Sequence, residues 1–206
     1  ILTSTKMLPK IEKLNMDSMQ LKVFSDNILV AYPVEDTKDK KEVFIAYQKI
    51  QTFLHFFLSM FVTEGFLFRG AITINKLLIN ELMVWGAGLS EVVHLEENVA
   101  IYPRVIISEE LLKVFDEYNL SDVEFEEKFS CLKDSDDNVY FDFFDYSDWQ
   151  AMDSHLPLAK AKIIEKIQKE KGGKNRAKIL QKYNWFKNYL DEVEQIYSEV
   201  KSNYDI

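Results

Sequence analysis

The segment LKVFSDNILVAYP, from Leu21 to Pro33, places a single carboxylate, Asp26, between two short apolar runs. Apolar runs on either side of Ser-Asp-Asn predict two strands joined by a tight turn, and Pro33 ends the second strand. A carboxylate presented at such a turn can bind Mg²⁺ or Mn²⁺, because these hard cations prefer oxygen ligands. Aspartate is also common in turns because its side chain hydrogen-bonds the backbone two residues further on. Asp26 is therefore either a metal ligand or a turn residue.

Further apolar patterns predict the elements that must hold this turn in place. Between Lys41 and Glu64, apolar residues recur at helical spacing, and Gly65 supplies a stop. The sequence then predicts strands at FLFRGAITI and LMVWG, a helix at AGLSEVVHLEE, a strand at RVIIS, a helix at EELLKVFDEYN and a hairpin at FSCLKDSDDNVYFDFF. This order favours an α+β fold in which helices cover a ferredoxin-like mixed or antiparallel sheet.

The composition changes after about Ser154 to Lys, Glu, Ala and Leu, which predicts two helices separated by KGGK at residues 171–174. We therefore divide the chain into a domain at residues 1–150 and a C-terminal helical extension at residues 151–206. Apolar residues of the last helix step alternately by four and three, as in a heptad seam: Ile179, Tyr183, Phe186, Leu190, Val193, Tyr197 and Val200. Such a seam packs either on the chain's own core or on a partner helix in a dimer.

Charge and cysteine content exclude several classes of protein. The 206 residues carry a formal net charge of −9, which argues against binding nucleic acid through a broad basic surface. Cys131 has no second cysteine with which to form an internal disulfide, which fits a reducing compartment. The longest apolar run, FLHFFLSMFV at residues 53–62, is too short to span a bilayer. We expect a cytoplasmic protein without a membrane span or a nucleic-acid partner.

Three blocks, taken in order, resemble the catalytic domain of class III nucleotide cyclases. That family has a K-x-x-G-D hairpin, a strand of form R-x-G-I-x-x-G, and a helix of form G-x-x-V-N-x-A-x-R-L-E. The matching positions are Lys22, Ser25 and Asp26 in the first block, Arg69 to Asn75 in the second and Gly86 to Glu96 in the third. The strings FSDNI, RGAITI and IYPRVIIS are most similar to the compact bacterial pyrimidine cyclases of Pycsar antiphage defence. The resemblance covers about residues 20 to 108.

This resemblance implies an enzyme that converts UTP or CTP into the 3′,5′-cyclic monophosphate, cUMP or cCMP, and pyrophosphate. In such a reaction the ribose 3′-hydroxyl attacks the α-phosphorus, and two divalent cations, Mg²⁺ or Mn²⁺, neutralise the charge that builds on the oxygens. The resemblance also implies a homodimer whose subunits share their active sites. Its cyclic nucleotide product would activate a separate effector during phage infection.

The resemblance assigns roles to five residues. Asp26 would bind metal, Lys22 would recognise the base, and Arg69 would contact substrate. The family's transition-state asparagine and arginine fall on Ser90 and His94. Ser90 can donate a hydrogen bond, and His94 carries charge when its pKa permits. For three of these residues a structural alternative remains open: a solvated lysine at Lys22, an internal ion pair at Arg69, and a surface or core histidine at His94.

One part of the family pattern is missing: a second metal-binding aspartate on an opening strand of form F-x-D-I-x-G-F. We expect that strand upstream of Ile1. Without it, the alternative function is a cyclase-like nucleotide sensor or interaction module that has lost catalysis. A second acidic segment, DSDDN at residues 134–138, is similar to the start of a calcium loop, but Val139 stands where such loops need glycine. We predict a hairpin turn there.

Overall fold

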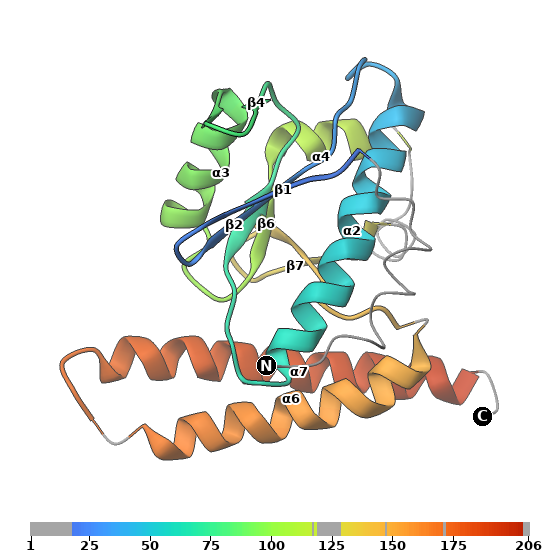
Figure 1. Ribbon diagram of the computed structural model, residues 1–206. Coiled ribbons are helices and arrows are strands. Elements are labelled where there is room, and N and C mark those ends of the chain that lie inside the picture. Colours follow the sequence, from blue (N-terminus) through green and yellow to red (C-terminus); the bar gives the residue numbers. More distant parts are fainter. Residues whose placement is uncertain (1–17, 117, 119–128, 147, 171, 204–206) are drawn as a thin grey trace. The chain divides into compact units, whose positions relative to one another are not determined.

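The computed structural model describes residues 18–116, 118, 129–146, 148–170 and 172–203 (Figure 1). The chain divides into two units, Ile1–Phe53 and Leu54–Ile206. One long helix, α2 (Lys40–Val62), begins in the first unit and ends in the second. No helix within these described residues is both long enough and apolar enough to cross a membrane.

The first unit contains the predicted hairpin. Strands β1 (Gln20–Phe24) and β2 (Asn27–Ala31) pair antiparallel, with Phe24 opposite Asn27. The turn is thus only two residues long, Ser25 and Asp26. Ser25 has a φ of 56°, in the left-handed region that two-residue hairpin turns of the primed types require.

The start of α2 is capped by its own sequence. The Asp39 carboxylate accepts hydrogen bonds from the backbone N–H groups of Lys41 and Glu42, at 3.0 and 3.2 Å. The Glu42 carboxylate in turn accepts from the backbone N–H groups of Glu35 and Asp36, at 2.7 and 3.0 Å. The two bonds to Asp39 satisfy N–H groups that a helix start otherwise leaves unpaired, and the two bonds to Glu42 hold the preceding loop against the first turn. They explain why the helix begins where the apolar periodicity predicts it.

The second unit is built on a mixed four-stranded sheet in the order β3 (Gly70–Ile72), β6 (Val105–Ile107), β8 (Val139–Phe141) and β7 (Cys131–Lys133). β3 and β6 are parallel, whereas β6–β8 and β8–β7 are antiparallel. The α+β class is therefore confirmed in general terms. The strand predicted at FLFRGAITI is shorter than expected, because Phe66 and Phe68 pack edge-on against Phe61 of α2 instead of joining the sheet.

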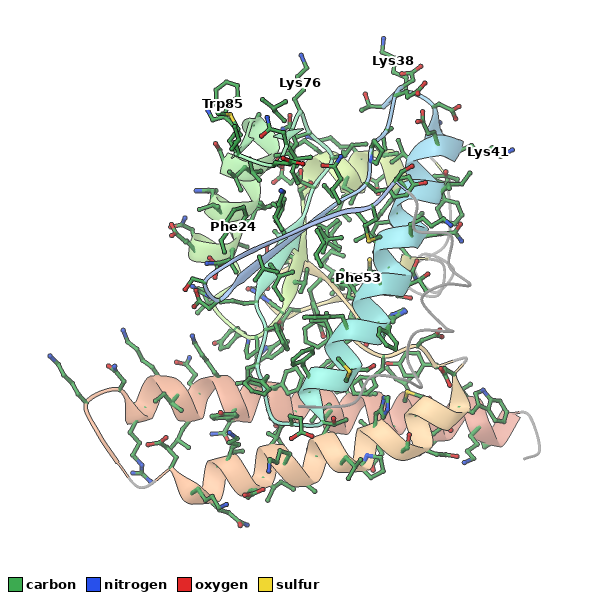
Figure 2. All side chains as sticks on the ribbon, in the orientation of Figure 1. Phe24, Lys38, Lys41, Phe53, Lys76 and Trp85 are labelled. Atoms are coloured by element: carbon green, nitrogen blue, oxygen red, sulfur yellow. The ribbon has the colours of Figure 1, made fainter. Side chains whose placement is uncertain are left out.

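A small hairpin precedes helix α3 (Ala87–Asn98): β5 (Val84–Trp85), which lies within the strand predicted at LMVWG, pairs with β4 (Leu78–Ile79), which the sequence did not predict. Figure 2 shows Trp85 projecting from this hairpin, and 73% of the residue is exposed. Gly86, with a φ of 145°, links β5 to α3. A Cβ at Gly86 would lie 2.4 Å from the Lys76 carbonyl oxygen, so only glycine lets α3 start this close to that backbone.

The short helix α4 (Glu109–Asp116) follows β6. The last two helices, α6 (Trp149–Lys169) and α7 (Arg176–Asn203), run antiparallel and side by side in Figure 1. The centre of the heptad seam of α7 is buried within the chain: Phe186, Leu190 and Val193 are fully buried, and Tyr197 is 7% exposed, whereas Ile179 at the start of the seam is 37% exposed. Packing of this central part on the chain's own core is one of the two alternatives that the sequence left open. α6 begins before Ser154, the position at which the composition changes.

Candidate functional site

The Asp26 carboxylate stands at the tip of the β1–β2 hairpin, as predicted, and is exposed. One hydrogen bond reaches it from the neighbouring side chain, Asn27 Nδ2 to Asp26 Oδ1 at 3.3 Å. Lys22 lies in the middle of β1 opposite Leu29 and is half-buried. The hairpin therefore presents an accessible carboxylate from a short, geometrically constrained turn, which is what a divalent cation ligand needs.

Arg69 immediately precedes β3, and its Nε forms an ion pair with the Glu96 carboxylate of α3. This contact is the internal ion pair that the sequence left open for Arg69. The Arg69 side chain is still 40% exposed. The ion pair joins α3 to the residue that precedes β3. Next to it, Gly70 at the start of β3 donates its backbone N–H to the carbonyl oxygen of Arg104, just before β6, at 3.1 Å.

Ser90 and His94 are both exposed on α3, one helical turn apart and therefore on the same face. The Ser90 hydroxyl lies 3.5 Å from the Gly86 carbonyl oxygen, so its hydrogen bond within the helix is long. Asn98 Nδ2 lies 3.2 Å from His94 Nδ1 and also donates to the His94 carbonyl oxygen at 2.9 Å. A neutral His94 that accepts at Nδ1 keeps its proton on Nε2, which is then a hydrogen-bond donor.

Two further residues near α3 were not singled out by sequence reasoning. Asn75 Nδ2 donates to the Glu91 carboxylate at 2.9 Å, which joins the loop after β3 to α3. Glu91 is also hydrogen-bonded to Glu110, and this contact holds the pKa of Glu110 below its usual value. The only sequence signal for these contacts was the position of Asn75 at the end of the second family block. Asn75 and Glu91 fix the helix that carries Ser90.

The acidic segment 134–138 forms the turn between β7 and β8, as predicted, and its carboxylates have a structural partner. Arg104 is completely buried and pairs with both Asp134 and Asp136. This pairing lowers the pKa of Asp136 to about 2. Trp185 of α7 donates its indole N–H to Asp134 at 3.1 Å. The signal that could have found this cluster was an arginine standing at the start of a buried apolar strand.

A second buried polar cluster surrounds Asp142, immediately after β8. Its carboxylate accepts hydrogen bonds from the hydroxyls of Tyr189 and Tyr146 and from the backbone N–H of Phe144. Burial raises the pKa of Asp142 to about 6. His55 of α2 donates Nε2–H to the Asp142 carbonyl oxygen at 3.1 Å, and burial lowers its pKa to about 4. Both clusters hold elements together inside the second unit.

The candidate residues are distributed over both units. Lys22 and Asp26 belong to the hairpin of the first unit, whereas Arg69, Ser90 and His94 belong to the second. In the described part of the chain, no three side chains of His, Cys, Asp or Glu gather in a way that would hold a metal ion. No protein-family model, curated protein or solved structure matches the chain significantly.

Proposed function

We propose that the protein is a nucleotidyl cyclase of class III type that converts a pyrimidine triphosphate, UTP or CTP, into its 3′,5′-cyclic monophosphate and pyrophosphate. The observation that carries this proposal is the exposed Asp26 carboxylate in a two-residue hairpin turn. The three sequence blocks support it through their order along the chain. In the proposed fold, the four-stranded sheet of the second unit is part of the ferredoxin-like sheet that a class III cyclase has.

The proposed reaction forms a bond between the ribose 3′-oxygen and the α-phosphorus and breaks the bond to pyrophosphate. When bound, Mg²⁺ or Mn²⁺ would lower the pKa of the 3′-hydroxyl and neutralise charge on the phosphate oxygens. Asp26 is the described residue that fits such a cation, because it is a carboxylate, exposed and fixed at a turn.

The exposed residues of α3 would stabilise the negative charge that develops on the phosphate oxygens in the transition state. The Ser90 hydroxyl and the His94 Nε2–H are hydrogen-bond donors on one helix face. Arg69 would position this face through its ion pair with Glu96. Lys22 would contact the base from the hairpin. In the proposed homodimer the hairpin of one subunit and α3 of its partner complete one active site, and the product activates a separate effector.

A specific observation favours a second function, a nucleotide sensor that has lost catalysis. Ser90 and His94 both have partners within α3 itself, at 3.5 Å to Gly86 and 3.2 Å to Asn98. Neither residue supplies the permanent charge of the arginine that the family places at the second position. A binding site without turnover does not need donors that act only in the transition state. The sensor would bind a triphosphate and leave it intact.

The test uses the protein produced from its complete gene, incubated separately with UTP, CTP, ATP and GTP in the presence of Mn²⁺, with products identified by mass spectrometry. We expect a cyclic nucleotide from one pyrimidine triphosphate, and a loss of about 100-fold or more in the Asp26→Asn variant. The matched control is Asp36→Asn, an exposed aspartate of the same unit outside the hairpin. Absence of cyclic product from all four triphosphates, with one of them binding to the folded protein, would instead establish the sensor.

A further inference from the structure

Charge is distributed very unevenly along this acidic chain. Between Lys160 and Lys187 the sequence has ten Lys or Arg residues and two Glu residues, a net charge of +8. The whole chain carries −9, so the rest of the sequence carries −17. The basic segment covers the second half of α6, the connection to α7 and the first half of α7. Figure 2 shows nitrogen-tipped side chains projecting around this end of the helical pair.

The basic residues of the helical pair fall into two groups. One group has carboxylate partners: Lys160 pairs with Asp191 and Glu194, Lys187 with Asp191, and Lys201 with Asp153. The other group lies at the start of α7. There Arg176, Lys178 and Lys182 have no carboxylate partner among the residues that the structure describes. Their charges are therefore available to an external anion.

Two adjoining grooves lie along this unpaired group. The first has a volume of about 300 Å³ and is lined by Asn175, Lys178, Ile179 and Lys182. The second, of about 250 Å³, is lined by Lys178, Gln181 and Lys182 on one side and by Arg69, Glu97, Ile101 and Tyr102 on the other. The two grooves share Lys178 and Lys182 as lining residues and therefore adjoin each other. We call them together the α7 groove.

The electrostatics of the α7 groove favour an anion. Lys178 and Lys182 are separated by one helical turn, about 6 Å along the axis, and so lie on the same face. Arg69 faces them across the second groove, and its pairing with Glu96 uses Nε. Glu97 is the single carboxylate among the lining residues. The positive end of the α7 dipole adds to the same field over its first turn.

We propose that the α7 groove binds the phosphodiester backbone of a nucleic-acid strand. Neighbouring cations along the groove match successive phosphates of a strand, and the side-chain amide of Asn175 can donate a hydrogen bond to a phosphate oxygen. The Gln181 amide already donates to the Tyr102 hydroxyl at 3.2 Å, which joins the two walls of the second groove. A membrane fits less well, because surface anchoring needs large apolar side chains that enter the lipid. Among the residues that line the α7 groove, only two are large aliphatic side chains, Ile101 at 58% exposed and Ile179 at 37%.

This inference revises one expectation from the sequence. The net charge of −9 argues against a broad basic surface, but it averages a local cluster with the acidic remainder of the chain. Phosphate binding depends on the local cluster, because salt screens charges separated by more than about 8 to 10 Å. The groove lies within the second unit and does not involve Asp26, Ser90 or His94, and Arg69 is the one residue that it shares with the proposed catalytic site.

The test measures fluorescence anisotropy of labelled single-stranded RNA, single-stranded DNA and duplex DNA as the full-length protein is added, at salt concentrations between about 50 and 200 mM. Binding through about three phosphates of a single strand predicts a slope of log K against log salt of about −2. The groove variant is K178E/K182E. The matched control is K187E/K201E, which makes the same change in total charge at lysines of α7 that do not line the groove.

We expect the groove variant to lose at least about tenfold in affinity and the control to lose less than about threefold, with both variants folded by circular dichroism. The strand bound most tightly identifies whether RNA or DNA is the natural ligand. Three results would overturn the proposal: no binding of any strand at the lowest salt, equal losses in both variants, or sedimentation with anionic phospholipid vesicles in place of oligonucleotide binding.

Discussion

Two buried groups of the second unit, Asp142 and His55, should make opposite contributions to the pH dependence of folding. The pKa of Asp142 is raised from 3.8 to about 6, so the folded protein holds a proton that the unfolded chain has released. Its stabilisation is therefore full below pH 3.8 and is lost as the pH rises through 6. The pKa of His55 is lowered from 6.5 to about 4. Its stabilisation is full above pH 6.5 and is lost as the pH falls through 4.

The two contributions nearly cancel in the wild-type protein. Each pKa unit corresponds to about 1.4 kcal/mol, so each group changes the free energy of unfolding by at most about 3 kcal/mol across this range. Acidification from neutral pH to pH 4 strengthens the fold through Asp142 and weakens it through His55. The cause of both pKa changes is burial, and the Asp142 carboxylate is kept in place by Tyr146 and Tyr189.

Single variants should separate the two contributions. Asp142→Asn removes the contribution of Asp142. When the pH is lowered from 7 to 4, the free energy of unfolding of this variant should therefore fall relative to that of the wild type by about 2 to 3 kcal/mol. His55→Gln keeps a hydrogen-bond donor near the Asp142 carbonyl oxygen and removes the contribution of His55. Over the same change in pH, its free energy of unfolding should rise relative to that of the wild type by about 2 to 3 kcal/mol. Urea unfolding followed by circular dichroism at both pH values measures the difference. Variants that change with pH in the same direction relative to the wild type would refute this reasoning.

Three other substitutions test the packing that positions the candidate site. Gly86→Ala should destabilise by about 2 kcal/mol or more, because its Cβ would meet the Lys76 carbonyl oxygen at 2.4 Å; an unchanged melting temperature would contradict this. Arg104→Met removes the buried partner of Asp134 and Asp136 and should cost about 3 to 5 kcal/mol in urea unfolding at pH 7. The loss should be smaller at pH 3, because Arg104 is the main cause that lowers the pKa of Asp136 to about 2. Phe186→Ala empties a fully buried position in α7 and should cost about 3 to 5 kcal/mol, whereas a cost under 1 kcal/mol would mean that α7 does not belong to the core.

Local sequence signals predicted the elements of the fold well. Helical periodicity and capping residues placed α2 and α3 within a few residues, and the Ser-Asp turn placed the first hairpin. These features depend on neighbours within four residues along the chain. The predicted strand at residues 66–74 was too long, because packing of Phe66 and Phe68 on α2 decided its start. Sequence propensity carries no information about such a contact.

The polar contacts of the second unit could not be predicted for the same reason. Arg104 meets Asp134 and Asp136 across about thirty residues of sequence, and Asp142 meets Tyr189 across an even longer separation. The sequence left an internal ion pair open as the alternative for Arg69, but it did not identify the partner, Glu96. The net charge of the whole chain also gave no indication of the basic residues in the first half of α7. Averages over a whole chain remove the local clustering that electrostatic binding requires.

We propose that this chain cyclises a nucleoside triphosphate, and the stoichiometry of the reaction tests this activity most directly. Pyrophosphate and cyclic nucleotide would be quantified together from one incubation of the full-length protein with UTP or CTP and Mn²⁺. Cyclisation predicts one pyrophosphate for each 3′,5′-cyclic monophosphate, with no linear monophosphate, because the ribose 3′-oxygen is the only nucleophile. Pyrophosphate accompanied by linear monophosphate, or no release of pyrophosphate at all, would contradict the cyclase assignment.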